Sequence, residues 1–254
     1  MKLSPWPYPM WIAHRGAGKL APENTLAAFR LGAQYGYRAF ECDVKLSADG
    51  VPFLLHDDTL ERTTHAAGDA GAQSWAALSQ LDAGGWHSRA FAGEPLASFA
   101  AIAAYCLRNG HALNIEIKPS PGRGRETGEV TAAAAAQRWA GHAVPPLLSS
   151  FKPEALEGAM ASAPQLPRAL LLDELWEGWF ERALALACVA VVANHKLFDR
   201  ALVERAHSAG LRTLAYTVND DAVARKLLGH GLDGLITDAV DRFAPGAALT
   251  HPGS

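Results

Sequence analysis

Short apolar runs alternate with longer Ala/Leu-rich segments along the whole chain. Runs such as Val189–Val192 are continuous rather than alternating, which is typical of strands with helices on one side and a packed interior on the other. We predict eight strands: Trp11–Ala13, Ala39–Val44, Leu113–Ile117, Pro146–Ser149, Arg168–Leu172, Ala187–Ala193, Arg212–Val218 and Gly234–Ile236.

Eight strands that alternate with helices in 254 residues favour the α/β class and a single (β/α)₈ TIM barrel over residues 1–254. An open, doubly wound sheet is the alternative, because spacing along the chain does not show whether the sheet closes. The intervening helices have recognisable ends. Gly36 stands where a left-handed cap would end the first helix, and Asp199 can cap a later helix that Gly210 ends.

One connection is much longer than the others. From Lys45 to Pro95 the chain spends about 50 residues, where a strand-to-helix connection needs only a handful. Val51–Leu55 is a candidate extra strand after an Asp-Gly turn, and the rest is rich in Gly, Ala and polar residues. We interpret residues 46–95 as an insertion after the second strand, at the end of the barrel where it could shape a substrate pocket.

Composition excludes several classes of protein. A net charge of −3 and a pI near 6.4 give no general attraction for nucleic acid or an acidic membrane. The three cysteines form no CxxC pair, so neither a disulfide framework nor a thiolate zinc site is expected. With no secretory signal or long apolar run, we expect a cytoplasmic protein that does not insert into the membrane. The sequence leaves its oligomeric state open.

Acidic side chains interrupt two of the predicted strands. Residues two apart in a strand point the same way, so Glu41 and Asp43 share one face, as do Glu116 and Lys118. Three carboxylates converging at the barrel interior would repel one another and be costly to bury. One divalent cation, Mg²⁺ or Ca²⁺, resolves this because both ions prefer oxygen ligands.

Two histidines follow strands at the same rim. His14 comes directly after the first strand, and His56 ends the extra strand. Two imidazoles beside a phosphoryl group can donate and accept protons near neutral pH. Arg15 and Lys118 supply positive charge that can neutralise phosphate oxygens, Arg15 in a bidentate manner.

These motifs, in this order, resemble the glycerophosphodiester phosphodiesterase family. The similarity extends more weakly through later segments and so covers nearly the whole chain. The residues that carry it are His14-Arg15-Gly16, Ala21-Pro22-Glu23-Asn24-Thr25, Glu41-x-Asp43, His56-Asp57 with Arg62-Thr63-Thr64, Glu116-Ile117-Lys118, Ser149-Ser150-Phe151, Tyr216-Thr217-Val218-Asn219 and Ile236-Thr237-Asp238.

The resemblance implies hydrolysis of small glycerophosphodiesters, such as glycerophosphocholine or glycerophosphoethanolamine, to sn-glycerol 3-phosphate and an alcohol. It implies a metal site formed by Glu41, Asp43 and Glu116. It also implies that His14 and His56 act as acid and base, and that Arg15 and Lys118 contact the phosphate.

Two other functions fit the same residues less well. A lysophospholipase D-like enzyme would need an apolar entrance, for which the insertion offers Trp75, Trp86 and Phe91. A barrel that binds a phosphorylated ligand without turnover would not need the intact acid–base and ligand residues.

Several neighbouring residues have an ordinary structural interpretation. Glu23 and Asn24 are as suited to capping the first helix as to meeting the substrate. Trp176 and Trp179 have the spacing of one helix face. His195 follows another predicted strand and is a weaker candidate for the site.

Overall fold

The strands form a closed cylinder in the computed structural model, which describes residue 3, residues 6–243 and residue 245. Parallel pairing runs through the sheet and returns from β1 to β2, and β3 adds an antiparallel edge to β2. The strands are β1 (Trp11–Ala13), β2 (Ala39–Leu46), β3 (Pro52–Leu54), β4 (Ala112–Ile117), β5 (Leu147–Ser150), β6 (Arg168–Leu172), β7 (Ala190–Asn194), β8 (Arg212–Tyr216) and β9 (Gly234–Thr237).

The pairing of β1 with both β9 and β2 confirms the barrel and rules out the open sheet. The strands lie close to their predicted positions, with one clear error. β7 begins at Ala190 and not at Ala187. Ala187 has a φ of 49°, so the chain turns there as it leaves the preceding helix and cannot yet extend into a strand.

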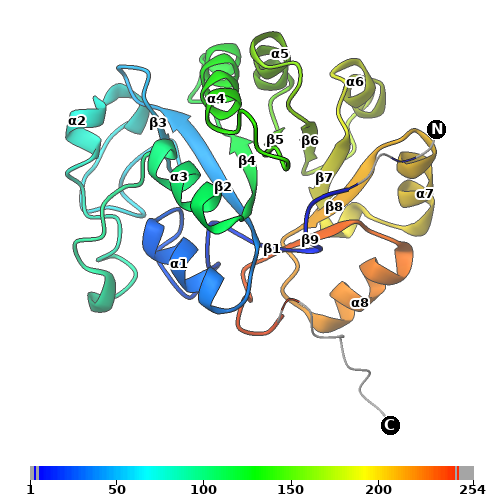
Figure 1. Cartoon of the computed structure of the whole chain (residues 1–254), viewed down its shortest axis with the longest axis horizontal. Coiled ribbons are helices and arrows are strands. Elements are labelled where there is room, and N and C mark those ends of the chain that lie inside the picture. The colour runs from blue at the N-terminus through cyan, green and yellow to red at the C-terminus, as the bar shows by residue number, and fades with distance from the viewer. Residues whose placement is uncertain (1–2, 4–5, 244, 246–254) are drawn as a thin grey trace.

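Helices cover the outside of the barrel, one between each pair of consecutive parallel strands (Figure 1). They are α1 (Leu26–Gln34), α3 (Phe99–Asn109), α4 (Gly124–Arg138), α5 (Pro153–Ser162), α6 (Trp179–Ala185), α7 (Arg200–Ser208) and α8 (Asp221–His230). Asp199 caps α7 through the backbone N–H of Leu202, as predicted. The prediction for Trp176 is wrong, because the left-handed residue Gly178 precedes α6 and leaves Trp176 outside it.

The two faces of the strands bury different side chains. Ile115 and Ile117 pack in the cluster that also contains helix residues, which is the layer between the sheet and the helices. The alternate residues of β4, Asn114 and Glu116, therefore face the barrel interior, as the strand period predicts. A second apolar cluster fills the interior: Ile12, Ala39, Leu147, Ala169, Leu171, Ala190, Val192, Leu214 and Ile236.

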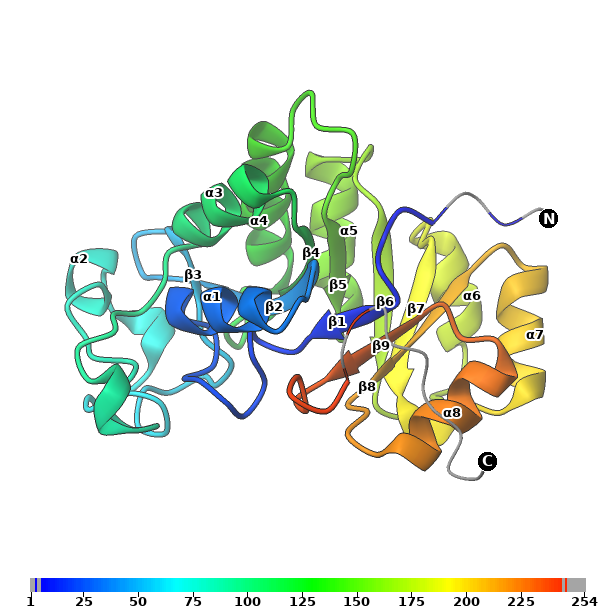
Figure 2. The ribbon, with the colours of Figure 1, turned by 60° about the horizontal axis from the view of Figure 1, so that its bottom comes forward.

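Between β2 and α3 the chain forms a separate lobe beside α1 and α3 (Figure 2). The lobe contains β3, α2 (Trp75–Leu78) and two short 3₁₀ turns, η1 (Ala70–Ala72) and η2 (Arg89–Phe91). Its apolar cluster is formed by Phe53, Leu55, Leu60, Ala70, Leu78, Ala83 and Leu96.

The prediction that residues 1–254 form one domain remains a prediction and includes terminal residues outside the described part. Within the described part of the chain, no helix has the length and apolar character needed to cross a membrane.

Candidate active site

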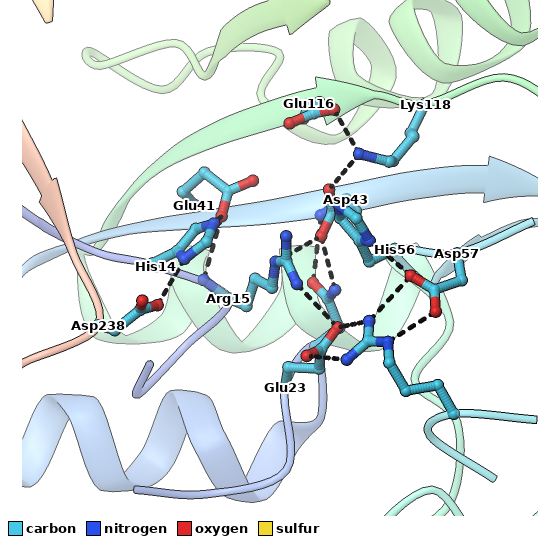
Figure 3. A network of polar contacts seen from close by, with 12 residues as sticks. His14, Arg15, Glu23, Glu41, Asp43, His56, Asp57, Glu116, Lys118 and Asp238 are labelled. Atoms are coloured by element: carbon cyan, nitrogen blue, oxygen red, sulfur yellow. Dashed lines mark hydrogen bonds and ion pairs between the residues drawn. The ribbon is translucent and has the colours of Figure 1, made fainter. Parts of the chain in front are cut away.

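Three carboxylates from the neighbouring strands β2 and β4 meet on the interior side of the barrel (Figure 3). The two strands are parallel, and their register sets Asp43 opposite Glu116 and Glu41 opposite Asn114. One oxygen from each of Glu41, Asp43 and Glu116 lies within 4.8 Å of the other two. The strand period and the register thus bring together the three residues that the sequence selected.

The donor set fits a hard divalent cation. Two oxygens bonded to one Mg²⁺ or Ca²⁺ at about 2.0–2.6 Å can lie at most about 4–5 Å apart, which this cluster satisfies. Glu41 Oε1 and Asp43 Oδ1 are buried and accept no hydrogen bond among the described residues. Buried carboxylate oxygens without a donor are costly, and a cation supplies the missing interaction.

The buried carboxylates differ in their electrostatic environments. Burial and the nearby charge of Asp43 raise the pKa of Glu41 to about 8. The same two causes raise the pKa of Glu116. Burial acts in the same direction on Asp43, but Arg15 and Lys118 outweigh it and hold the pKa of Asp43 well below its usual range. Burial and mutual repulsion therefore oppose the ionised forms of Glu41 and Glu116, and bound positive charge would favour them.

Asp43 is held by neighbours on several sides. Asn24 donates to its Oδ2 at 2.8 Å and accepts from its backbone N–H at 3.1 Å. Arg15 Nε lies 3.1 Å from the same Oδ2, and Lys118 Nζ lies 3.6 Å from Oδ1. Lys118 also donates to Glu116 at 3.0 Å. Arg15 and Lys118 thus lie directly beside the carboxylate cluster.

His14 has a carboxylate behind its ring. Its Nδ1 lies 2.6 Å from Asp238 Oδ1, and its Nε2 lies 3.8 Å from Glu41 Oε2. Asn219 fixes Asp238 by donating to Oδ2 and by accepting the backbone N–H of Asp238. Burial disfavours the imidazolium, but the hydrogen bond to Asp238 and the charge of Glu41 outweigh it and raise the pKa of His14.

His56 has a similar partner. Its Nδ1 lies 2.6 Å from Asp57 Oδ1, and Arg62 holds Asp57 in turn. Burial lowers the pKa of His56, with Asp43 opposing that shift. Both histidines therefore have Nδ1 engaged by a carboxylate, which leaves Nε2 as the ring atom available for proton transfer.

Two adjoining cavities open at this end of the barrel. The smaller, of about 160 Å³, is lined by the three residues His14, Arg15 and Glu41 together with Tyr216 and other interior side chains. The larger, of about 370 Å³, is lined by the last residues of β4 and β5, by the loops that follow these two strands and by the loop after β3. Four residues line both cavities: His56, Glu116, Lys118 and Phe151.

Glu23 and Asn24, which the sequence analysis considered as caps of the first helix, have other partners. Glu23 and Asn24 do not cap α1, because the side chain of Thr25 accepts the N–H of Ala28 and forms that cap. Asn24 bonds to Asp43, and Glu23 accepts from Arg15 at 3.0 Å. Both residues therefore belong to the site.

The weaker candidates from the sequence analysis lie outside the two cavities. Within the described residues, neither cavity is lined by His195 or by the insertion aromatics Trp75, Trp86 and Phe91. Trp75 packs near Phe53, with 6.1 Å between ring centroids.

Four residues of the network were missed as functional candidates: Asp57, Asp238, Asn219 and Arg62. A signal for Asp238 is present in the sequence. In a closed barrel the last strand lies beside the first, so the residue after β9 is a neighbour of the residue after β1. For Arg62, the only signal is its place in a motif shared with the resembled family.

Known proteins are similar over most of the chain. The model described as "Glycerophosphoryl diester phosphodiesterase family" matches residues 14–242. A glycerophosphodiester phosphodiesterase from Caldanaerobacter subterraneus subsp. tengcongensis is 30% identical over 228 residues, covering 89% of this chain and 93% of that protein.

Solved structures have the same fold. An Oleispira antarctica phosphodiesterase in complex with the product sn-glycerol-3-phosphate is 36% identical, with a TM-score of 0.85 over 92% of this chain and 95% of that one. A glycerophosphodiester phosphodiesterase from Agrobacterium tumefaciens str. C58 is 28% identical, with a TM-score of 0.77 over 93% of this chain and 99% of that one.

Proposed function

The chain belongs to the glycerophosphoryl diester phosphodiesterase family, and we propose that it converts glycerophosphodiesters, such as glycerophosphocholine or glycerophosphoethanolamine, into sn-glycerol 3-phosphate and an alcohol. The Oleispira antarctica relative, whose structure contains sn-glycerol-3-phosphate, supports this product. The observation that carries the proposal is the cluster of three carboxylates beside two histidines, at the junction of two cavities.

Glu41, Asp43 and Glu116 would hold one divalent cation, Mg²⁺ or Ca²⁺. Their oxygens are close enough to share an ion, and two of them accept no hydrogen bond within the described chain. When bound, such a cation supplies Lewis-acid stabilisation of negative charge on the phosphate oxygens. Lys118, which lines both cavities, and Arg15, which lines the smaller one, add positive charge for the same oxygens.

The two cavities suggest how the substrate is oriented. A phosphodiester has two arms, and the residues common to both cavities mark the place of the phosphorus between them. The smaller cavity suits the glycerol arm, and the larger one suits the head group. His14 lines only the glycerol cavity, whereas His56 lines both.

This orientation assigns different roles to the histidines. His14 takes the proton from the glycerol 2-hydroxyl as its oxygen bonds to phosphorus. His56, as an imidazolium with a proton on Nε2, donates that proton to the head-group oxygen as the bond from this oxygen to phosphorus breaks. The alcohol is released and His56 is left as the neutral ring. Water then opens the cyclic phosphate, with the two histidines exchanging roles. Direct attack of water on the diester is the alternative route.

A substrate analogue without the 2-hydroxyl separates the two routes. Turnover of glycerophosphocholine is compared with that of its 2-deoxy analogue at saturating Mg²⁺. The cyclic route predicts loss of turnover with the analogue. Full activity on the analogue would refute it and leave direct attack by water.

A lysophospholipase D-like activity is the second candidate. The residues that could form its apolar entrance, Trp75, Trp86 and Phe91, line neither cavity within the described chain. Because an acyl chain needs an apolar wall, glycerophosphocholine should be turned over faster than lysophosphatidylcholine. A preference for the lysolipid would favour the second candidate.

A further inference from the structure

One arginine of the insertion joins the two loops that carry the site. Arg62 donates to both oxygens of Asp57, from Nε at 2.6 Å and from Nη2 at 2.9 Å. It also bonds to both oxygens of Glu23, at 2.8 Å each. The planar guanidinium thus forms bidentate hydrogen bonds to two carboxylates at once. A lysine ammonium cannot reproduce this geometry.

On one side the contacts lead to His56. Asp57 Oδ1, which accepts from Arg62 Nη2, is also the oxygen that lies 2.6 Å from His56 Nδ1. An ionised carboxylate at Nδ1 requires that nitrogen to carry the proton, which leaves Nε2 unprotonated in the neutral ring. Fixing the plane of Asp57 therefore fixes both the orientation and the tautomer of His56.

On the other side the contacts lead to the carboxylate cluster. Glu23 Oε1 accepts a hydrogen bond from Arg62 and another from Arg15 Nη1, the latter at 3.0 Å. Arg15 Nε in turn lies 3.1 Å from Asp43 Oδ2. A continuous chain of contacts therefore runs from His56 through Arg62 to Asp43. Figure 3 shows its two labelled ends, His56 and Asp43, with the labelled Asp57, Glu23 and Arg15 between them.

We propose that Arg62 is a positioning residue, which aligns His56 for proton transfer through Asp57 and holds Arg15 beside the cluster through Glu23. The proposal rests on the function proposed above, in which His56 transfers a proton. A merely structural brace would affect the stability of the insertion, but it would leave the tautomer of His56 and the rate of the chemical step unchanged.

The kinetic test compares three variants of the full chain with glycerophosphocholine as substrate. Arg62→Gln should lower kcat by about 10–100-fold with less than about a threefold change in KM, because remote partners of catalytic groups have effects of that size. Arg62→Lys keeps the positive charge but lacks the planar guanidinium that makes the bidentate contacts, so it should recover only part of this loss in kcat. Arg89→Gln removes an exposed arginine of the same insertion and should match the wild type.

A double-mutant cycle tests whether Arg62 acts through Asp57. If it does, Asp57→Asn combined with Arg62→Gln should lose clearly less activity than the product of the two single losses, because only the contact through Glu23 remains to be lost. The proposal would be overturned if the loss of kcat in the double variant equalled the product of the losses in the two single variants. A normal kcat in Arg62→Gln would also overturn it.

A substrate-free measurement separates this inference from the proposed function. The ring ¹⁵N shifts of His56 report its tautomer directly, and His56→Ala identifies the signal. Wild type should show the Nδ1–H form, and Arg62→Gln should show a mixture of the two forms. An unchanged tautomer in the folded Arg62→Gln protein, or in Arg62→Lys if the Gln variant does not fold, contradicts the inference. Absence of wild-type turnover would instead contradict the proposed function.

Discussion

Asp238 Oδ1 lies 2.6 Å from His14 Nδ1, although 224 positions separate the two residues in sequence. Closure of the barrel brings them together, because β9 pairs with β1 and ends one residue before Asp238. The carboxylate orients the ring and makes His14 a better proton acceptor, as carboxylate partners do for histidines in other hydrolases.

Asp238→Asn should therefore lower kcat by about 10–100-fold, the usual range for residues that orient a catalytic group. The amide keeps the size of the side chain but removes the charge that stabilises the imidazolium. Steady-state kinetics with glycerophosphocholine measures the effect. Asp241→Asn, at an exposed position three residues further along, is the matched control and should have normal activity. Equal activity of the two variants would show that Asp238 does not assist His14.

Removing one of the proposed acid–base or metal-binding side chains should lower activity more than Asp238→Asn does. We expect His14→Ala, His56→Ala and Glu41→Ala each to lose at least about 10²-fold in activity, as for acid–base and metal-binding groups generally. Circular dichroism should show that each variant stays folded, because these polar groups contribute little to the apolar core. Near-normal turnover in one of the variants would remove that residue from the mechanism.

The ion pair of Asp57 with Arg62 should be visible in the pH dependence of stability. The hydrogen bonds from Arg62 hold the pKa of Asp57 well below its ordinary value of 3.8. As the pH falls, Asp57 is therefore protonated in the unfolded chain before it is protonated in the folded protein. The stabilisation by the ionised Asp57 is complete above the pKa of the unfolded state and is lost as the pH falls through the pKa of the folded state.

Urea denaturation of wild type and Asp57→Asn at pH 6 and pH 3 measures this effect. The wild type should be the more stable at pH 6, and the difference in free energy of unfolding should shrink at pH 3. A difference that is the same at both pH values would mean that the Asp57 charge does not stabilise the fold.

Close packing of α1 against the β1–α1 loop gives a stability prediction. A Cβ added at Gly32 would lie 2.1 Å from the backbone oxygen of Gly16, next to Arg15. Gly32→Ala should therefore destabilise the protein by about 1–3 kcal/mol, as overpacking generally does, and lower activity by displacing the loop.

Gly229→Ala is the matched control, because a Cβ at that position of α8 meets no atom within 4 Å. It should be neutral or stabilising, since alanine favours helix over glycine. Thermal unfolding compares the two variants. Equal stability would contradict the packing argument.

The barrel and the carboxylate cluster could be predicted because both follow from local rules. Continuous apolar strands separated by helices predict a parallel sheet, and the two-residue strand period puts Glu41 and Asp43 on one face. Parallel strands end at one rim of a barrel, which brings Glu116 to the same place.

The partners of the histidines could not be predicted in the same way. Arg62 lies in an insertion without periodic pattern, and its contact with Glu23 spans 39 positions. Such a contact depends on how loops fold over the barrel and on the reach of one long side chain. Sequence also misplaced the cap of α1, because Asn24 and Thr25 are both good capping residues and only Thr25 has the extended backbone of a cap.

The central claim is that Glu41, Asp43 and Glu116 share one divalent ion. Crystals grown with Mn²⁺, a substitute for Mg²⁺ that can be located by its anomalous scattering, test this most directly. We predict one anomalous peak within about 2.0–2.6 Å of an oxygen of each carboxylate, and no peak there in crystals of Glu41→Gln. A peak located elsewhere, or no peak between these three side chains in the wild type, would contradict the account.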